Sequence, residues 1–426
     1  MTNEPKNVPE LRFPEFEEEW VEKKLGEIGE FCKSYSFSRA KEGNGKVKHI
    51  HYGDIHSKFE SVLSSDKDIP NIDENKEMEF IQKGDLVFAD ASEDYKDLGR
   101  AIMINFEPNF IVSGLHTHLF RPFNINLSSF FIQFTKTNQY HHFIQKEGNG
   151  ISVLGISKKN LGKLNLYIPY SSEEQQKIGN FFSKLDDQIE LEERKLELLE
   201  QQKKGYMQKI FSQELRFKDE NGDDYPEWES KKIKELFNII DGDRGKNYPS
   251  EKDFCYKGHT LFLDTGNVTK KGFSFYTNRF IDKEKDDMLR NGKLELNDFV
   301  ITSRGTLGNI GFYDQNIHYK YPNIRINSAM LILRPLNIKF DNQYLYFLLK
   351  DDAIAMFMKQ YRVGSAQPHI TKKDFGNMKT NVITNINEQR KIAQFLTIID
   401  KLVIKQCNKV RLLKQRKQGL LQKMFI

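Results

Sequence analysis

Side chains able to hydrogen-bond to bases or phosphates gather between the predicted strands in both halves of the chain. Arg and Lys suit guanine, Asn and Gln suit adenine, and Ser and Thr suit either. For any single residue of this kind, the alternative is an ordinary solvated surface position. We interpret the following as candidate nucleic-acid contacts: Lys41, Asn44, Lys46, His51, Ser92, Lys96, Arg100, Arg244, Lys246, Arg304, Thr306, Asn323, Arg325, Asn327, Gln360 and Arg362.

Two arginines are the sharpest of these candidates. Arg304 lies in the stretch Ser303-Arg304-Gly305-Thr306, directly after a predicted strand. The glycine beside it would let the backbone approach a ligand closely. Arg325 lies between two asparagines, in Asn323-Ile324-Arg325-Ile326-Asn327. Both stretches are therefore expected to contact bases.

Motifs for catalysis or cofactor binding are missing from the sequence. It has no GxxxxGK[ST] phosphate loop, no GxGxxG after a strand and no HExxH zinc motif. It also has no Asn-Pro-Pro-Tyr-like tetrapeptide of the kind found in amino-methyltransferases. His116 and His118 share one face of a predicted strand, but no third ligand is in view, so a metal site is not expected. We predict that this chain is not an enzyme and binds no cofactor.

Length and composition favour a protein of several domains without a membrane segment. The 426 residues exceed one comfortable core, and no apolar run approaches the roughly 20 residues that span a bilayer. Cys32, Cys255 and Cys407 are far apart and odd in number, which fits reduced thiols in the cytoplasm. The net charge of +5 permits a nucleic-acid partner without requiring one.

A heptad pattern predicts one long helix from Gln175 to Phe211, and the same pattern recurs 214 residues later. A period of 3.5 residues held over more than four heptads is typical of a coiled coil. Two unrelated amphipathic helices are the alternative, but they would not keep one register. The predicted seam consists of Ile178, Phe182, Leu185, Ile189, Leu196, Leu199, Tyr206 and Ile210, and of Ile392, Leu396, Ile399, Val403, Val410, Leu413, Leu420 and Met424.

The repeat extends beyond the helix. Glu10-Leu11-Arg12-Phe13, followed by Trp20, recurs as Glu214-Leu215-Arg216-Phe217, followed by Trp228. The first helix runs directly into the second copy of this stretch, whereas the second helix ends at Ile426. The first copy stands instead at the beginning of the chain. We therefore expect a two-fold ring cut open, with the N-terminal stretch close to the end of the second helix.

The segments between the helices predict mixed α/β (α+β) domains. Each half has a turn that leads into an apolar strand, a strand closed by Arg-Pro, an amphipathic helical segment and a glycine-containing turn. The halves diverge chiefly at 35–80 and 90–116, and at 240–295 and 303–327, as expected for one scaffold with two specificities. The paired stretches are Lys83–Phe88 with Leu296–Ile301, His118–Pro122 with Met330–Pro335, and about Ser129–Gln145 with Gln343–Tyr361.

Charge favours pairing of the two helices with each other. From Asp186 to Lys209 there are seven acidic and five basic residues, whereas from Lys401 to Ile426 there are eight basic residues and no acidic one. Complementary flanks favour an intramolecular pair, and the ring topology makes that pair antiparallel. A helix from Ile178 to Ile210 would span roughly 50 Å. We predict that it holds two reading domains a fixed distance apart.

Taken in order, these stretches resemble the DNA specificity subunit of type I restriction-modification systems. The resemblance rests on the tandem plan of globular unit and long helix, and no single motif is specific. Ile383 replaces Pro169 before the second helix, and Ala89-Asp90-Ala91-Ser92 replaces the Arg-Gly turn in the first half. The motifs that carry it are Tyr52–Ile55 and Gly84–Leu86, Thr265–Val268 and Ser303–Gly305, Gly364–Ile370, and Glu174–Ile178 with Glu388–Ile392.

The resemblance implies a division of the chain into a tail (1–10), two target recognition domains (11–170 and 212–384) and two spacer helices (171–211 and 385–426). It implies a bipartite double-stranded DNA target, two methylation subunits and, in the full complex, restriction and translocase subunits. S-adenosylmethionine, ATP and Mg²⁺ would bind those partners. A coiled-coil protein adaptor is the alternative, distinguished by its lack of salt-dependent DNA binding. A self-contained nuclease or methyltransferase would need a catalytic motif.

Overall fold

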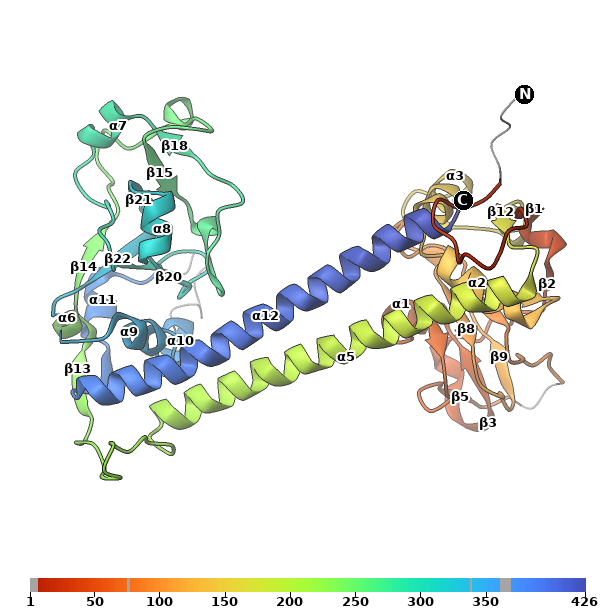
Figure 1. Cartoon of the computed structure of the whole chain (residues 1–426), viewed down its shortest axis with the longest axis horizontal. Coiled ribbons are helices and arrows are strands. Elements are labelled where there is room, and N and C mark those ends of the chain that lie inside the picture. Colours follow the sequence, from red (N-terminus) through yellow and green to blue (C-terminus); the bar gives the residue numbers. More distant parts are fainter. Residues whose placement is uncertain (1–6, 75–76, 338, 361–368) are drawn as a thin grey trace. The chain divides into compact units, whose positions relative to one another are not determined.

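The computed structural model describes residues 7–74, 77–337, 339–360 and 369–426 (Figure 1). The chain forms two compact units. Unit 1 comprises residues 1–194 and 407–426, and unit 2 comprises residues 195–406. The long helices α5 (Ser172–Phe211) and α12 (Ile386–Met424) each contribute a part to both units. The division into recognition domains and spacer helices keeps these helices whole and stays a prediction.

Unit 1 is built around a five-stranded sheet of order β2-β10-β6-β8-β4, beside which β3 pairs with β5 and, in parallel, with β9. Its strands are β1 (Val21–Lys24), β2 (Gly29–Phe31), β3 (Glu42–Ile50), β4 (Val62–Leu63), β5 (Asn71–Ile72), β6 (Leu86–Ala89), β7 (Ala91–Ser92), β8 (Ala101–Ile104), β9 (Ile111–Ser113), β10 (Thr117–Pro122), β11 (Leu154–Gly155) and β12 (Asn165–Ile168). Its helices before α5 are α1 (Tyr52–Ser57), α2 (Ile125–Phe134), α3 (Asn138–Glu147) and α4 (Lys158–Leu161), with 3-10 turns η1 (Leu25–Glu27) and η2 (Arg39–Lys41).

Unit 2 repeats this plan with a four-stranded sheet of order β14-β22-β19-β20 and a second sheet in which β15 pairs with β18 and, in parallel, with β21. Its strands are β13 (Glu229–Lys232), β14 (Phe237–Asp241), β15 (Thr260–Leu263), β16 (Val268–Thr269), β17 (Gly272–Phe273), β18 (Phe280–Ile281), β19 (Phe299–Thr302), β20 (Ile310–Phe312), β21 (Ile324–Ile326), β22 (Met330–Pro335) and β23 (Lys379–Val382). Its helices before α12 are α6 (Ile233–Leu236), α7 (Lys283–Met288), α8 (Gln315–Lys320), α9 (Asn342–Leu349), α10 (Asp352–Gln360) and α11 (Lys372–Asn377), with 3-10 turns η3 (Glu251–Asp253) and η4 (Thr265–Asn267).

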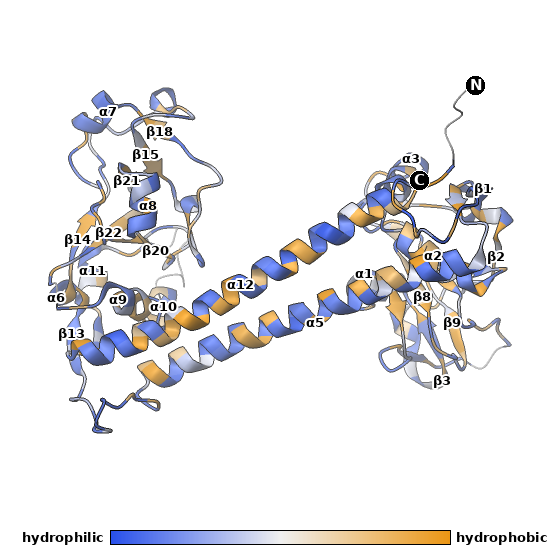
Figure 2. Ribbon diagram, viewed as in Figure 1, coloured by the Kyte–Doolittle hydropathy of each residue, from blue (hydrophilic) through white to orange (hydrophobic). Residues whose placement is uncertain are grey.

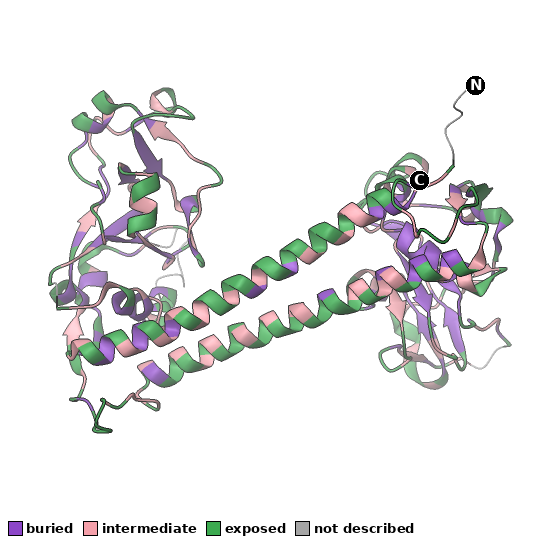
Figure 3. Ribbon diagram, in the orientation of Figure 1, coloured by how far each residue is buried: buried purple, intermediate pink, exposed green. Residues whose placement is uncertain are grey.

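Central strands are buried on both faces, which explains their unbroken apolar runs. In β19, Phe299 and Ile301 belong to one hydrophobic cluster of unit 2, and Val300 belongs to the cluster on the opposite face. β6 alternates in the same way in unit 1. The central strands are hydrophobic and buried, whereas the long helices alternate along their length (Figures 2 and 3). The predicted α+β class is confirmed.

An Arg-Pro strand end is fixed in the same way in each unit. The Arg121 guanidinium donates to the buried carboxylate of Asp85 at 2.9 and 2.8 Å. In unit 2, Arg334 donates to Asp298 at 2.9 Å through both of the corresponding nitrogens. Burial raises the pKa of Asp298, and Arg334 opposes that shift. The repeated Arg-Pro is therefore a structural anchor.

The N-terminal stretch docks at the end of α12 as expected. Leu11 N donates to Lys423 O at 2.8 Å, and in unit 2 Leu215 N donates to Lys209 O at 2.9 Å. These are the same contacts in the two repeats, because Lys209 and Lys423 are 214 residues apart. The cut-ring interpretation is confirmed by this repeated hydrogen bond.

The two long helices are antiparallel, as predicted. In unit 1, Asp186 near the start of α5 pairs with Lys417 near the end of α12. In unit 2, Lys203 near the end of α5 pairs with Asp400 near the start of α12. These two ion pairs are copies of each other under the 214-residue repeat. Of the predicted seam, Tyr206 is the exposed member, at 39%, and its ring meets Phe395 edge-on at 5.1 Å.

One expectation from periodicity needs correction. The segments near Ser129–Gln145 and Gln343–Tyr361 were each expected to form one helical segment, but each contains two short helices, α2 with α3 and α9 with α10. Thr137 begins α3 by accepting a hydrogen bond from Tyr140 N through its hydroxyl, which is the role of an N-cap. An apolar period does not reveal such a break.

Candidate nucleic-acid interface

The turn that follows β19 is the centre of the candidate interface in unit 2. Gly308 N donates to Thr302 O at 3.0 Å, and Asn309 N donates to the Thr302 hydroxyl at 3.0 Å. Gly305 and Gly308 have φ of +67° and +85°, a region that disfavours residues with a Cβ. The turn is thus closed at its base and leaves Gly305 and Thr306 exposed.

Arg304 is half-buried in this turn, and part of its hydrogen-bonding capacity is unused. Its backbone forms a bridge with His369, whose Nδ1 lies 3.2 Å from Ser303 O. Arg304 Nε and Ser303 Oγ are buried, and neither has a hydrogen-bond partner among the described residues. Buried polar groups are normally paired, so these two atoms are exceptions in the part of the chain that the structure describes.

Two further candidates lie beside this turn. Arg244 is exposed and donates to Ser328 O at 3.2 Å, while the neighbouring Ala329 carbonyl accepts from Ser303 N at 2.8 Å. The side chain of Asn327 accepts from Ala329 N at 2.9 Å. The structure therefore brings Arg244 and Asn327 close to the Arg304 turn.

Arg325 has a different environment from the one expected. It is 5% exposed, and its Nε donates to the Asp286 carboxylate. Its other nitrogens donate to the carbonyls of Asn291, Asp286 and Leu289 at 2.9, 3.0 and 3.2 Å. Burial opposes the charge of Asp286, but Lys293 and Arg325 outweigh it and lower its pKa. These contacts fix the loop around α7, so the proposed interface omits Arg325.

The remaining candidates of unit 2 are dispersed. Asn323 Nδ2 lies 3.5 Å from His259 Nε2, at the edge of the second sheet. Lys246 and Gln360 are exposed, the latter as the last residue of α10. Arg362 lies outside the described residues.

In unit 1 the equivalent turn has another chemistry. Asp90 follows β6, and its carboxylate oxygens lie 3.2 Å from His116 Nδ1 and 3.6 Å from His118 Nδ1. His116 has φ of +52°, and such positive values are uncommon outside glycine. It was expected on the strand face with His118, but it precedes β10. Burial lowers the pKa of His118, which favours its neutral form.

Several unit 1 candidates have structural partners. His51 caps α1 by accepting from Gly53 N at 3.1 Å, and Ser92 is buried in β7, opposite β11. Arg100 donates to His56 O at 2.7 Å and Phe59 O at 3.3 Å. The exposed candidates are Lys96, beside Arg100 in a hollow of about 300 Å³, and Lys41, Asn44 and Lys46, which are in η2 and the first half of β3.

Three residues beside these turns, His369, Asn309 and Asp90, were not among the candidate contacts predicted from the sequence. The 214-residue repeat relates His369 to Gly155. In the structure Gly155 pairs with Ala91 in unit 1 just as His369 pairs with Arg304 in unit 2. Over the described ranges, no group of three His, Cys, Asp or Glu side chains could hold a metal ion. No described helix is long and apolar enough to cross a membrane.

Comparison with known proteins identifies the family. The family model for the type I restriction modification DNA specificity domain matches twice, at residues 17–201 and 225–413. The MjaVIII type I restriction enzyme specificity subunit of Methanocaldococcus jannaschii is 26% identical over 289 residues, which are 65% of each chain. A second specificity subunit assigned in that organism, MjaX, is 23% identical over 437 residues, covering 97% of this chain and 94% of the relative.

Solved structures show the same fold. The S subunit of a type I restriction-modification system from M. genitalium has a TM-score of 0.59 at 16% identity, covering 98% of this chain and 99% of that one. A chain from a structure on complex assembly and conformational transition of the type I R-M system has a TM-score of 0.56 at 15% identity, with coverage of 95% and 97%. The chain belongs to the type I restriction-modification DNA specificity family, and it is a non-catalytic specificity subunit with two target recognition domains that direct the complex to DNA.

Proposed function

We propose that the chain recognises a bipartite double-stranded DNA target, one half for each recognition domain (11–170 and 212–384). The spacer helices (171–211 and 385–426) fix the separation of the two domains and carry two methylation subunits. Restriction and translocase subunits join in the full complex. S-adenosylmethionine, ATP and Mg²⁺ bind those partners, and the assembly acts in the cytoplasm.

The observation that carries base reading is the Arg304 turn. Its glycines let the backbone come near a DNA groove, and Arg304 Nε is a buried donor without a partner among the described residues. An arginine can donate two hydrogen bonds to guanine O6 and N7. Thr306 lies in the same turn and Arg244 lies beside it, and both supply further donors.

The two domains read different half-sites. By strand register, Ala91 occupies in unit 1 the position that Arg304 occupies in unit 2, since each pairs with the equivalent residue of the segment before α4 or α11. An alanine cannot donate to a base edge. The Asp90–His116 pair supplies an acceptor and an imidazole there instead.

The test is Arg304→Ala in the chain assembled with its methylation subunits. Selection of bound sequences should show relaxed preference at one base position, with a loss of about 1–3 kcal/mol on the preferred target. Arg290→Ala, at an exposed arginine that pairs with Asp243, is the matched control and should keep the wild-type preference. An equal loss on all sequences would assign Arg304 to a phosphate instead.

A further inference from the structure

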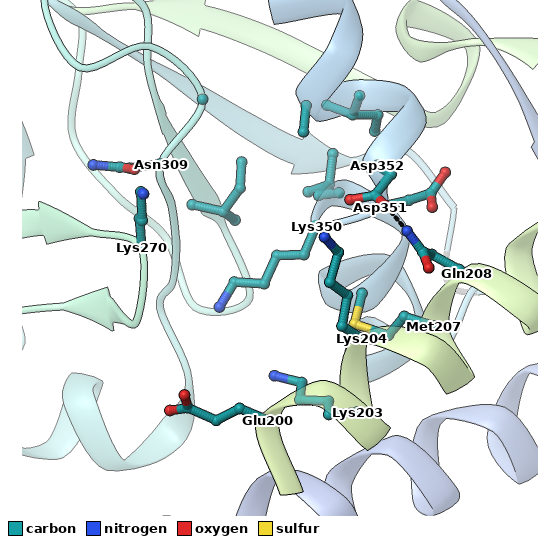
Figure 4. Close-up of a pocket in the computed structure, with 15 residues that line it drawn as sticks. Glu200, Lys203, Lys204, Met207, Gln208, Lys270, Asn309, Lys350, Asp351 and Asp352 are labelled. Carbon is teal, nitrogen blue, oxygen red and sulfur yellow. Dashed lines mark hydrogen bonds between the residues drawn. The ribbon is translucent and has the colours of Figure 1, made fainter. Parts of the chain in front are cut away.

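A hollow of about 330 Å³ lies beside the Arg304 turn in unit 2 and is lined by four lysines (Figure 4). Lys203 and Lys204 come from α5, Lys350 follows α9, and Lys270 lies in the turn between β16 and β17. None of these lysines is among the candidates named from the sequence. They are brought together by elements far apart in the chain.

Lys350 is a half-buried member of this group. Its Nζ donates to the Tyr346 hydroxyl at 2.6 Å and lies 4.3 Å from the centre of that ring. No carboxylate of the described residues forms an ion pair with it. Burial lowers the pKa of Lys350 to about 8, and the nearby charge of Lys203 adds to this shift, whereas the charge of Asp400 opposes it. A bound anion would stabilise the protonated ammonium group of Lys350.

The equivalent lysine of unit 1 has an ion pair that Lys350 lacks among the described residues. Lys136 stands 214 residues before Lys350 and pairs with Asp186 at 3.0 Å, in a group that Lys417 completes. In unit 2, Asp400 pairs with Lys203, the counterpart of Lys417. Lys136 thus forms an ion pair with its aspartate in unit 1, whereas among the described residues of unit 2 Lys350 forms none.

The carboxylates that line the hollow form no ion pair with Lys350 among the described residues. Asp352 accepts a hydrogen bond from Gln208 at 2.6 Å, on the side away from Lys270 (Figure 4). Asp351 accepts from Ala353 N at 3.3 Å. Glu200 also borders the hollow, so the four lysines still exceed the carboxylates that line it.

The hollow adjoins the turn that we assign to base reading. Gly308 and Asn309 line it, and the same two residues close the Arg304 turn on Thr302. A duplex held at Arg304 would bring its backbone next to these lysines. Lysine is a compact point charge that commonly binds phosphate.

We propose that this hollow binds a phosphate of the DNA backbone through Lys270, Lys350 and Lys203, so that α5 contributes to DNA binding as well as to spacing. The inference rests on the proposed function and deepens it. It also predicts that the equivalent hollow of unit 1 does not bind a phosphate, because Lys136 and Arg100 there already have partners.

The test measures the salt dependence of DNA binding by Lys270→Gln, Lys350→Gln and the double variant, each assembled with the methylation subunits. Each lost phosphate contact should lower the slope of log K against log salt by about 0.9. The affinity ratio of wild type to a single variant should then be about 3- to 4-fold larger at 50 mM than at 200 mM salt. Target preference should not change. Lys270 is exposed in a turn, so that variant tests the site even if Lys350→Gln folds poorly.

Lys218→Gln is the matched control, since Lys218 is an exposed lysine of the same unit that does not line the hollow. Equal slopes for Lys270→Gln, the control and wild type would overturn the inference. Calorimetric binding of inorganic phosphate with unchanged DNA slopes would identify a free-anion site and also overturn it. A wild-type assembly that lacks sequence preference would overturn the proposed function instead.

Discussion

At the scale of single residues, one buried carboxylate organises the docking of each recognition domain. Glu174 accepts from Arg12 Nε at 2.7 Å and from Trp20 Nε1 at 3.3 Å. In unit 2, Glu388 accepts from Arg216 at 3.2 Å and from Trp228 at 3.3 Å. This carboxylate explains why an arginine and a tryptophan recur near the start of each domain and a glutamate recurs at the start of each long helix.

Removing this carboxylate should be costly. Breaking a buried ion pair by removing one partner typically costs about 3–5 kcal/mol, and the Arg12 side chain of the Glu174 pair is 12% exposed. Glu174→Ala should lower the free energy of unfolding by about that amount, as measured by urea denaturation. Glu173→Ala changes an exposed neighbour and should have an effect within about 0.5 kcal/mol. Equal stability of the two variants would argue against this role of the Glu174 carboxylate.

At the scale of elements, the α2–α3 turn and the long helices of unit 1 meet in the group of Lys136, Asp186 and Lys417. Burial lowers the pKa of Lys136 to about 8, and Lys417 adds to this shift. Burial opposes the charge of Asp186, but the two lysines outweigh it and lower its pKa. This junction therefore depends on protonation.

The sign of the pH dependence follows from the lysine. The pKa of Lys136 is about 8 in the folded chain, and its ordinary value is 10.5. Between these pH values Lys136 is more protonated in the unfolded chain than in the folded one. Stability rises with pH where the unfolded state binds more protons. The wild-type free energy of unfolding should thus rise from pH 8 to 10 relative to that of Lys136→Met. Urea denaturation at pH 8, 9 and 10 measures it, and parallel curves would contradict the assignment.

At the scale of the whole molecule, we predict that the antiparallel helices set the separation of the two half-sites. Deleting one facing heptad from each helix, residues 192–198 and 405–411, should keep the remaining pairs in register. Seven residues of helix correspond to about 10 Å, or about three base pairs. Mapping of methylated sites should show that the spacing between the unchanged half-sites is shorter by this amount. An unchanged spacing would refute the prediction that the helices set the separation of the half-sites.

The sequence alone determined the repeat, the long helices and their antiparallel pairing, because these follow from local period, residue identity and net charge. The seam from Ile178 to Ile210 is a property of consecutive residues, and so is the α+β pattern of turns and apolar strands. The Arg304 turn was also visible, because a strand followed by Arg-Gly is a local signal.

Only the tertiary structure decided which charged residues are free to bind. Arg325 and Arg304 look alike in sequence, but Arg325 is buried on Asp286, while Arg304 Nε has no hydrogen-bond partner in the described part of the chain. Lys350 and Lys136 match in the repeat, yet Lys136 forms an ion pair with Asp186 while Lys350 forms none among the described residues. Burial and pairing depend on contacts between residues far apart in the chain, and local pattern does not specify those contacts.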